Sequence, residues 1–424
     1  MDISKTSKPN IVIIISDALR TKDLSLYGYF IETDKNIKKI ASESIVFRSN
    51  FSASNASDPS LTSIFSGKYP KTSGFIHQQP FIKKEEIDQL RKNKFWLPIY
   101  LKDLGYSTIS ATPLYSWFKK GFDYYMERDD KKGKKRILNI PFIKKILLLL
   151  PHWAYSLGKK IVKTRASPHF YSAEKVVDLA ISKINEKKEP FFLFMHFVDT
   201  HYPYPSASNS KEVGKNTINK ILEEIKYPSQ KEYIKKRFFD ISASSIEEIK
   251  NKRDESIIYV DKQIGRLYLF LKKRKLWDKT IFIILSDHGD NFGEHSIFFC
   301  RGGLYDSSTH VPLIMHLPKF PSKKINELTQ NIDIFPTIVE LLGERRIKMD
   351  GNSLIDLIKT GKPIRKKILL SDGFCDNRFA IRTKTKKLIL TENGKCYLCG
   401  AFHGEKKEEY NLKEDPEELN NLSK

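Results

Sequence analysis

The sequence has few cysteines, no nucleic-acid motif and no long apolar run, and each absence excludes a class of protein. Four cysteines in 424 residues do not make a disulfide framework, and they fit a reducing compartment. An RNP-like segment, a Cys/His finger and a basic heptad region are all missing, so we expect no nucleic-acid partner. The apolar run that ends at Asp17 is short and lacks a small-residue cleavage site, which predicts a buried strand and no signal peptide.

Acidic residues are outnumbered, with 51 Asp and Glu against 74 Lys and Arg. This balance favours an anionic partner such as a phosphate or sulfate ester, an anionic glycan or a lipid head group, although many lysines simply solvate the surface. No stretch is long enough to span a bilayer, and residues 137–163 come nearest to it. They predict either an interfacial helix on an anionic membrane or an insertion packed against the domain. We therefore expect a cytoplasmic protein with peripheral contact to the inner membrane.

Three of the cysteines lie near the C-terminus. Cys396 and Cys399 are separated by two residues and followed by His403, a spacing that could ligate zinc. A lone CxxC pattern has little specificity, and the alternative is a pair of thiols on a C-terminal hairpin. The sequence favours the thiol pair.

Strand-like and helix-like segments alternate along most of the chain. Buried strands are predicted at residues 9–16, 106–111, 190–199, 280–287 and 311–318, and helices at 172–187 and 252–274. This order predicts an α/β fold in which helices cover both faces of a central sheet. We expect a catalytic domain over residues 1–340, with insertions near 120–170 and 205–250. Short mixed runs predict a small antiparallel α+β subdomain over 341–424.

Two of the buried strands end in acidic residues. Asp17 follows the first strand, and Asp287 and His288 follow a later one. Sites in α/β sheets lie at the carboxyl ends of strands, where a carboxylate after apolar residues needs a positive partner. The two carboxylates and the imidazole predict a divalent metal site. The plainer alternative, two Asp caps at helix starts, is weaker for both residues together than for either alone.

A third predicted strand leads into the segment THYPYP, which contains His201. Its position matches those of Asp17 and Asp287, so His201 could donate a proton to an anion or a leaving group. A single histidine is more often structural, and the two readings remain balanced.

The stretch SNASDPSLTSIFSG, residues 54–67, is crowded with hydroxyl groups. Either one of them is a nucleophile at a helix N-terminus, or the stretch is a polar turn with a Ser or Thr cap. Its residues alone do not decide between the two.

Eight segments resemble, in family order, those of the sulfatases within the alkaline phosphatase superfamily. They are PNIVIIISDALR, SDPSLTSIFSGKYPKTSG, PFFLFMHFVDTHYPY, YVDKQIGRLYLFLKKRKLWDKTIFIILSDHGDNFGEH, YDSSTHVPLIMHLP, NIDIFPTIVELLG, DGNSLIDLI and YNLKEDPEELNNL. The resemblance covers nearly the whole chain. It implies an alkaline-phosphatase-like fold with a central mixed, mostly parallel sheet flanked by helices.

The resemblance also implies roles for individual residues. Ser57 falls on the nucleophile position, where many members carry a Cys or Ser that is oxidised to formylglycine. Asp17, Asp287 and His288 fall on metal positions, and His201 falls in the segment that contacts the substrate anion. Arg301 lies near the place of a family Lys that binds the ester. We also expect Asn55 to donate to the substrate anion.

The sequence departs from the family pattern at two important places. The formylglycine signature ends in Arg, but Leu61 stands there, and the segment that supplies a Lys and a His near residues 110–120 is absent. An unmodified Ser57 is therefore expected to form a covalent phospho- or sulfo-enzyme. That chemistry suits phosphoric esters well, because phosphoryl transfer needs mainly positioning and charge neutralisation.

The sequence favours a metal-dependent, sulfatase-like hydrolase that cleaves a sulfuric or phosphoric ester through Ser57. The expected substrate is anionic, sulfated or phosphorylated, and linked to a glycan or lipid. The cofactor is one divalent ion (Ca, Mn or Zn), with Asp290, Glu294 or His295 as candidates for holding a second. Two alternatives stay open: a phosphoethanolamine- or phosphoglycerol-type transferase acting on a surface glycan or lipid, and an inactive anion-binding protein.

Overall fold

A computed structural model describes most of the chain. The described residues are 8–126, 171–204, 228–238 and 246–423, apart from 94, 113–115, 203, 346 and 393, with 223 and 226 described singly. The predicted interfacial stretch at 137–163 and most of the two insertions lie outside these residues. In the described part, no helix is both long and apolar enough to cross a membrane.

A mixed sheet of eight strands forms the centre of the molecule. Its order is β4 (Tyr124–Tyr125), β3 (Ser107–Ser110), β5 (Phe191–Phe197), β1 (Asn10–Ser16), β6 (Thr280–Leu285), β7 (Leu313–His316), β2 (Ile45–Phe51) and β8 (Lys323–Gln330). Only β7 runs antiparallel to its neighbours, and the other pairings are parallel. The predicted mixed, mostly parallel sheet is confirmed.

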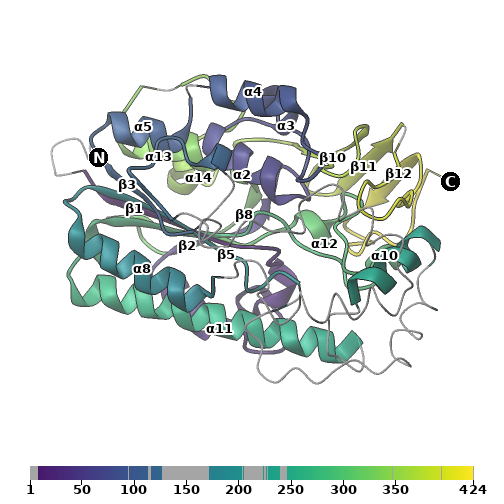
Figure 1. Ribbon diagram of the computed structural model, residues 1–424, viewed down its shortest axis with the longest axis horizontal. Coiled ribbons are helices and arrows are strands. Elements are labelled where there is room, and N and C mark those ends of the chain that lie inside the picture. The colour runs from purple at the N-terminus through teal and green to yellow at the C-terminus, as the bar shows by residue number, and fades with distance from the viewer. Residues whose placement is uncertain are drawn as a thin grey trace, which may run out of the picture.

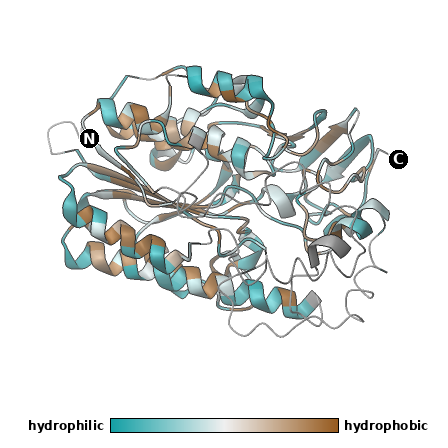
Figure 2. Cartoon of the chain, in the orientation of Figure 1, coloured by the Kyte–Doolittle hydropathy of each residue, from teal (hydrophilic) through white to brown (hydrophobic). Residues whose placement is uncertain are grey.

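Helices cover both faces of this sheet (Figure 1). One face carries α1 (Lys35–Ala41), α8 (Ala173–Glu186) and α11 (Ile246–Lys273), and the other carries α2 (Ser57–Ser66), α4 (Lys84–Lys92), α5 (Leu97–Asp103), α13 (Ile334–Leu341) and α14 (Ile355–Thr360). The other described α-helices are α10 (Pro228–Phe238) and the short helices α3 (Pro70–Ser73) and α12 (Asp306–Thr309). Apolar residues gather on the inner sides of the long helices (Figure 2).

The central strands are apolar on both faces because each face meets a helical layer. Along β1, Ile11, Ile13 and Ile15 pack into the core beneath α2, α5 and α13, while Val12 and Ile14 pack into the core beneath α8 and α11. A strand buried on both sides cannot alternate with polar residues, which explains the continuous apolar run. Because these strands are buried on both faces, polar residues are expected where the strands end.

A second sheet of four antiparallel strands lies at the C-terminal end of the chain (Figure 1). It is formed by β12 (Lys407–Asn411), β11 (Lys386–Thr391), β10 (Arg378–Arg382) and β9 (Ile368–Ser371), and it confirms the predicted small antiparallel sheet. Helix α14 precedes it and buries Ile355, Leu357 and Ile358 in the core of the large sheet. The domain division at residue 341 stays a prediction.

Candidate active site

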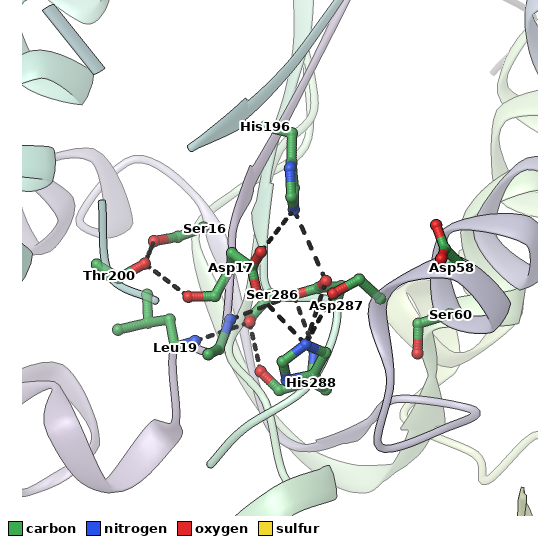
Figure 3. Close-up of polar contacts among 12 residues, drawn as sticks. Ser16, Asp17, Leu19, Asp58, Ser60, His196, Thr200, Ser286, Asp287 and His288 are labelled. Carbon is green, nitrogen blue, oxygen red and sulfur yellow. Dashed lines mark hydrogen bonds and ion pairs between the residues drawn. The ribbon is translucent and has the colours of Figure 1, made fainter. Parts of the chain in front are cut away.

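The strand order brings the predicted metal ligands together. Strand β1 pairs in parallel with β5 on one side and β6 on the other, so the three strands end at the same edge of the sheet. Asp17 follows β1, and Asp287 and His288 follow β6. Their ligand atoms all lie within 4.8 Å of one another, and all three side chains are buried (Figure 3).

Two carboxylate oxygens at this edge of the sheet have no hydrogen-bond donor among the described residues. Oδ1 of Asp17 and Oδ2 of Asp287 are buried and accept no hydrogen bond from a described residue. The other oxygen of Asp287 accepts from the backbone N–H groups of Ala18 and His288. Because an uncompensated buried carboxylate is costly, this donor set fits a divalent cation.

The pKa of Asp17 also fits a role as a metal ligand. Burial alone raises the pKa of a carboxyl group, but the interactions of Asp17 with His201, His288 and His196 outweigh it and hold its pKa well below the ordinary value. Asp17 is therefore ionised at neutral pH, as a metal ligand must be.

His288 has its ring orientation fixed by a backbone contact. Its Nδ1–H donates to the carbonyl of Gly289 at 2.7 Å, which leaves Nε2 as the acceptor nitrogen. Nε2 lies 3.3 Å from Oδ1 of Asp17 and 3.0 Å from Oγ of Ser57. This imidazole therefore joins the carboxylate pair to the hydroxyl of the predicted nucleophile.

Ser57 is half-buried at the first position of α2, directly after Ala56. A hydroxyl at a helix N-terminus gains from the helix dipole as it becomes an alkoxide. The chain directly after β9 approaches closely behind it: a Cβ built on Gly373 would lie 2.4 Å from the Cβ of Ala56. Only glycine fits there without moving the start of α2.

Asp58 follows Ser57 and is buried. Burial raises its pKa to about 6, while a hydrogen bond from the backbone N–H of Gln79 and the charge of Arg301 act in the opposite direction. The second position of α2 thus carries a carboxyl group that titrates near neutrality in the metal-free protein.

Arg301 reaches the same point from the loop that precedes α12. Its Nη1 donates to Nε2 of His288 at 2.6 Å and to Oγ of Ser57 at 3.4 Å. The loop is held by Asn55, whose Nδ2 donates to the carbonyls of Arg301 and Gly303 at 2.6 and 3.0 Å. The expectation that Asn55 donates to the substrate is thereby corrected, because its amide donors are taken by the backbone.

His201 lies after β5, at the sheet edge where sequence reasoning placed it. Its Nδ1–H donates to the carbonyl of Tyr202 at 2.6 Å, and its charge interaction with Asp17 is the largest of those that lower the pKa of that carboxyl. The structure therefore brings His201 near the carboxylate pair, and its proposed role in proton donation stays a prediction.

His196 was missed by sequence reasoning. It lies in β5, and its Nε2 is 3.7 Å from Oδ2 of Asp17 and 3.7 Å from Oδ2 of Asp287 (Figure 3). Residues Phe192 and Phe194 share its side of the strand and are buried in the core beneath α2. A polar residue in this alternating apolar series was the available signal.

The candidates for a second metal are engaged elsewhere. Nη1 of Arg20 donates to Oε1 of Glu294 at 2.7 Å, and the ring of His295 stacks on Tyr305 with centroids 3.5 Å apart. Among the described residues, neither these side chains nor Asp290 belongs to a group that could hold a metal ion. The geometry supports one cation at the Asp17 site.

The Arg20–Glu294 pair leads to a prediction about stability. Burial raises the pKa of Glu294, but the charge of Arg20 and backbone hydrogen bonds outweigh it and lower the pKa from 4.5 to about 2. A lowered folded-state pKa stabilises the protein above pH ~4.5, and this contribution is lost as the pH falls toward 2. We expect Glu294→Gln to lower the free energy of unfolding at pH 7 by on the order of 2 kcal/mol, measured by urea unfolding.

The difference between wild type and Glu294→Gln should shrink as the pH is lowered from 5 to 3. Glu327→Gln is the matched control, since Glu327 pairs with Lys384, whose side chain is half-exposed. It should change the free energy of unfolding by less than about 1 kcal/mol. An equal loss at pH 7 and pH 3 for Glu294→Gln would contradict the electrostatic explanation.

Comparison with known proteins agrees with this geometry. The model of the sulfatase family matches residues 9–344. The chain belongs to the sulfatase family. A second model, described as the C-terminal part of N-sulphoglucosamine sulphohydrolase, matches residues 293–424. Family membership confirms the predicted ester hydrolase acting on a sulfuric or phosphoric ester, and enzymes of this family generally depend on a divalent metal ion.

Curated relatives match nearly the whole of this sulfatase-family chain but share little of its sequence. It is 23% identical to a choline-sulfatase of Rhizobium meliloti, over 99% of this chain and 83% of the relative. It is also 23% identical to an N-acetylglucosamine-6-O-sulfatase of Bacteroides thetaiotaomicron, with the same two coverages.

Solved structures support the fold. A phosphonate monoester hydrolase of Agrobacterium radiobacter superposes with a TM-score of 0.65 at 19% identity, covering 98% of this chain and 92% of that one. A protein solved with its substrate D-glucosamine-2-N,6-O-disulfate superposes with a TM-score of 0.67 at 20% identity, covering 98% and 94%. The alkaline-phosphatase-like fold predicted for this sulfatase-family member is confirmed.

Proposed function

We propose that this protein hydrolyses a sulfuric or phosphoric ester through the unmodified hydroxyl of Ser57, with one divalent cation held by Asp17, Asp287 and His288. One observation carries the proposal. Nε2 of His288 lies 3.0 Å from Oγ of Ser57 and 3.3 Å from Oδ1 of Asp17, so nucleophile and metal ligands meet at one point. A divalent cation bound there would lower the pKa of the Ser57 hydroxyl and neutralise negative charge on the ester.

The protein's own groups account for the rest of the reaction. Oγ of Ser57 loses its proton to solvent and attacks the sulfur or phosphorus atom, and the bond to the leaving oxygen breaks. His201 gives that oxygen a proton and is reprotonated from solvent before the next turnover. Water then breaks the bond between Oγ and the transferred group, which regenerates the hydroxyl. Arg301 contributes positive charge beside Oγ, where the anionic group must sit.

The environment of Leu61 supports an unmodified serine. Leu61 stands where the formylglycine signature has Arg, and only 1% of it is exposed. It packs in the apolar core with Ile64 and Phe65. A charged side chain in that core would need a buried partner, so the modification signal is absent for a structural reason.

The substrate class follows from charge and from the relatives. A net charge of +23 favours an anionic substrate, and relatives are named for sulfated glucosamine and for choline sulfate. We propose a sulfated or phosphorylated glycan. A lipid-linked form of it would be consistent with the basic character of the chain.

The state of Ser57 is tested by mass spectrometry of the peptide that contains it. An unmodified residue gives the mass of serine, whereas formylglycine is lighter by two hydrogen atoms. Acid quenching during turnover should trap a sulfuryl or phosphoryl group on Ser57. An aldehyde at this position, or turnover without a trapped adduct, would contradict the proposed nucleophile.

The reaction class is tested with p-nitrophenyl sulfate, p-nitrophenyl phosphate and bis(p-nitrophenyl) phosphate, each with Ca²⁺, Mn²⁺ or Zn²⁺. We expect metal-dependent release of nitrophenol from at least one ester. If no ester is cleaved with any ion, the hydrolase proposal fails and the transferase and binding-protein alternatives gain.

Arg301 offers a more selective test of the site. We expect Arg301→Lys to lower kcat/KM by about 10²-fold, because the shorter side chain of lysine does not reach the place of Nη1, which contacts both Ser57 and His288. Arg266→Lys is the matched control, since Arg266 pairs with Asp178 on the outer surface. Equal kcat/KM for the two variants would show that Arg301 does not take part in the reaction.

A further inference from the structure

A second group of metal-binding side chains lies outside the active site. Sγ of Cys300, Cys396 and Cys399 and a ring nitrogen of His403 all lie within 4.8 Å of one another, and all four residues are buried. The sequence favoured a simple pair of thiols, because nothing in it joined distant Cys300 to the CxxC segment. The fold brings the three thiols and the imidazole to one point.

We infer that Cys300, Cys396, Cys399 and His403 bind one structural Zn²⁺ ion. Three thiolates and one imidazole form a donor set of structural zinc sites, which are four-coordinate and closed. Zn–S bonds of about 2.3 Å and Zn–N bonds of about 2.0 Å at tetrahedral angles place ligand atoms roughly 3.5–3.8 Å apart. The four ligand atoms lie within 4.8 Å of one another, so side-chain movements without a change of fold would bring them to these distances.

The local backbone is shaped to present these ligands. After Cys396 the chain turns back on itself: Gly400 N–H donates to the carbonyl of Cys396 at 2.7 Å, and Cys396 N–H donates to Ala401 at 2.8 Å. Gly400 has φ +70°, which favours glycine. The turn carries Cys399 to within 3.0 Å of Nε2 of His403.

The fourth ligand comes from the loop of the catalytic domain. A Cβ on Gly302 would lie 2.2 Å from Cδ2 of His403, so the imidazole packs directly on that loop. Nδ2 of Asn291 donates to the carbonyl of Cys300 at 2.8 Å. The loop backbone is therefore already held in the position that points Cys300 at the other ligands.

The charge of the site is compatible with burial. Binding of Zn²⁺ by three thiols releases three protons and leaves one net negative charge on the complex. Nη2 of Arg378 donates to the carbonyl of His403 at 3.0 Å, and Nη1 pairs with buried Asp372 at 2.8 Å, so a buried ion pair already lies beside the site. A disulfide would use only two of the three sulfurs and leave the third beside the imidazole without a role.

The position of the site suggests what the zinc does. Cys300 directly precedes Arg301, while the other three ligands belong to the C-terminal subdomain. Zinc would therefore fix the loop that presents Arg301 to Ser57. This consequence rests on the proposed function, whereas the zinc site itself does not.

The test separates this site from the active-site metal by using Asp287→Asn protein without a histidine tag. After loading with Zn²⁺ under reducing conditions and gel filtration, we expect one zinc per chain by mass spectrometry of the metal. A mercurial reagent that blocks thiols should release it to a metallochromic dye. Cobalt in its place should show the thiolate-to-metal charge-transfer absorption.

Variants add a matched comparison. Cys399→Ser should lower the retained zinc by more than about tenfold, whereas Cys375→Ser should retain it, because Cys375 is buried nearby but outside the group. If Asp287→Asn protein holds no zinc, or shows no cobalt–thiolate absorption, the inference is overturned. A disulfide between two of the three cysteines in peptide maps would overturn it equally. If a Ser57→Ala protein lacks hydrolase activity but still retains zinc, zinc binding at this site does not depend on the proposed function.

Discussion

Ser57→Ala is expected to lower kcat/KM by on the order of 10⁴-fold or more, because it removes the atom that would bond to sulfur or phosphorus. Oγ of Ser57 is the hydroxyl that lies 3.0 Å from Nε2 of His288. The other hydroxyl in the first turn of α2 is engaged elsewhere, since the Oγ of Ser60 donates to the carbonyl of Ser54 at 2.9 Å. Initial rates on the best p-nitrophenyl ester, with the covalent adduct as a second readout, measure the effect.

The matched control for this prediction is Ser60→Ala, the same change one helical turn further along α2. It should keep kcat/KM within about threefold and cost roughly 1 kcal/mol of stability through the lost hydrogen bond. Ser57→Ala activity above about one hundredth of wild type would mean that another group performs the attack. Equal losses in both variants would point to damage of the helix.

Asp287→Asn should have the second largest effect, by removing a charge from the proposed metal site. One oxygen of Asp287 accepts two backbone N–H groups, and the other is the buried atom without a hydrogen-bond donor. Asparagine keeps the shape of the side chain but presents a neutral group. We expect metal affinity to fall by about 10²-fold and kcat by about 10³-fold.

Thermal unfolding provides a readout of metal binding without substrate. Metal at about 100 times its Kd stabilises a folded protein by about 2.7 kcal/mol, so wild type should show a clear rise in Tm with Ca²⁺ or Mn²⁺. Asp287→Asn should show little rise at the same concentration. Asp290→Asn is the control, because Asp290 is buried in the same loop but outside the metal group, and it should keep the shift. A full shift in Asp287→Asn would remove Asp287 from the ligand set.

The strand-end residues of the site could be predicted from the sequence because each one follows a run of apolar residues that is typical of a buried strand. A strand apolar on both faces must expose its polar residues at its ends, which identified Asp17, Asp287 and His201 as candidates. Their distances depend on which strands are neighbours. The order β5–β1–β6 is set by the long-range packing of the two helical layers, which no local pattern encodes.

The residues that were missed or misjudged share one physical cause. His196 lies inside a strand, and Cys300 lies beside cysteines from a distant segment of the chain. The side-chain amide of Asn55 donates its hydrogen bonds to the backbone of a loop. Each role depends on a contact across the fold, whereas sequence patterns report only local periodicity and spacing. Ser57 and Arg301 were identified only through the resemblance to sulfatases. Composition and periodicity alone do not distinguish Ser57 from the neighbouring hydroxyl residues, or Arg301 from the many other basic residues.

The order in which the chain is synthesised has a consequence for when activity begins. The backbone N–H of Gly373 donates to Oδ1 of Asn55 at 2.9 Å, and Gly373 packs against Ala56, the residue that precedes α2. Strand β1 leaves the ribosome well before residue 373, so the start of α2 beside Ala56 lacks these contacts until residue 373 has emerged. A chain that stops before residue 373 should therefore be unable to attack esters, so hydrolysis should begin only after the segment that carries Gly373 has been made.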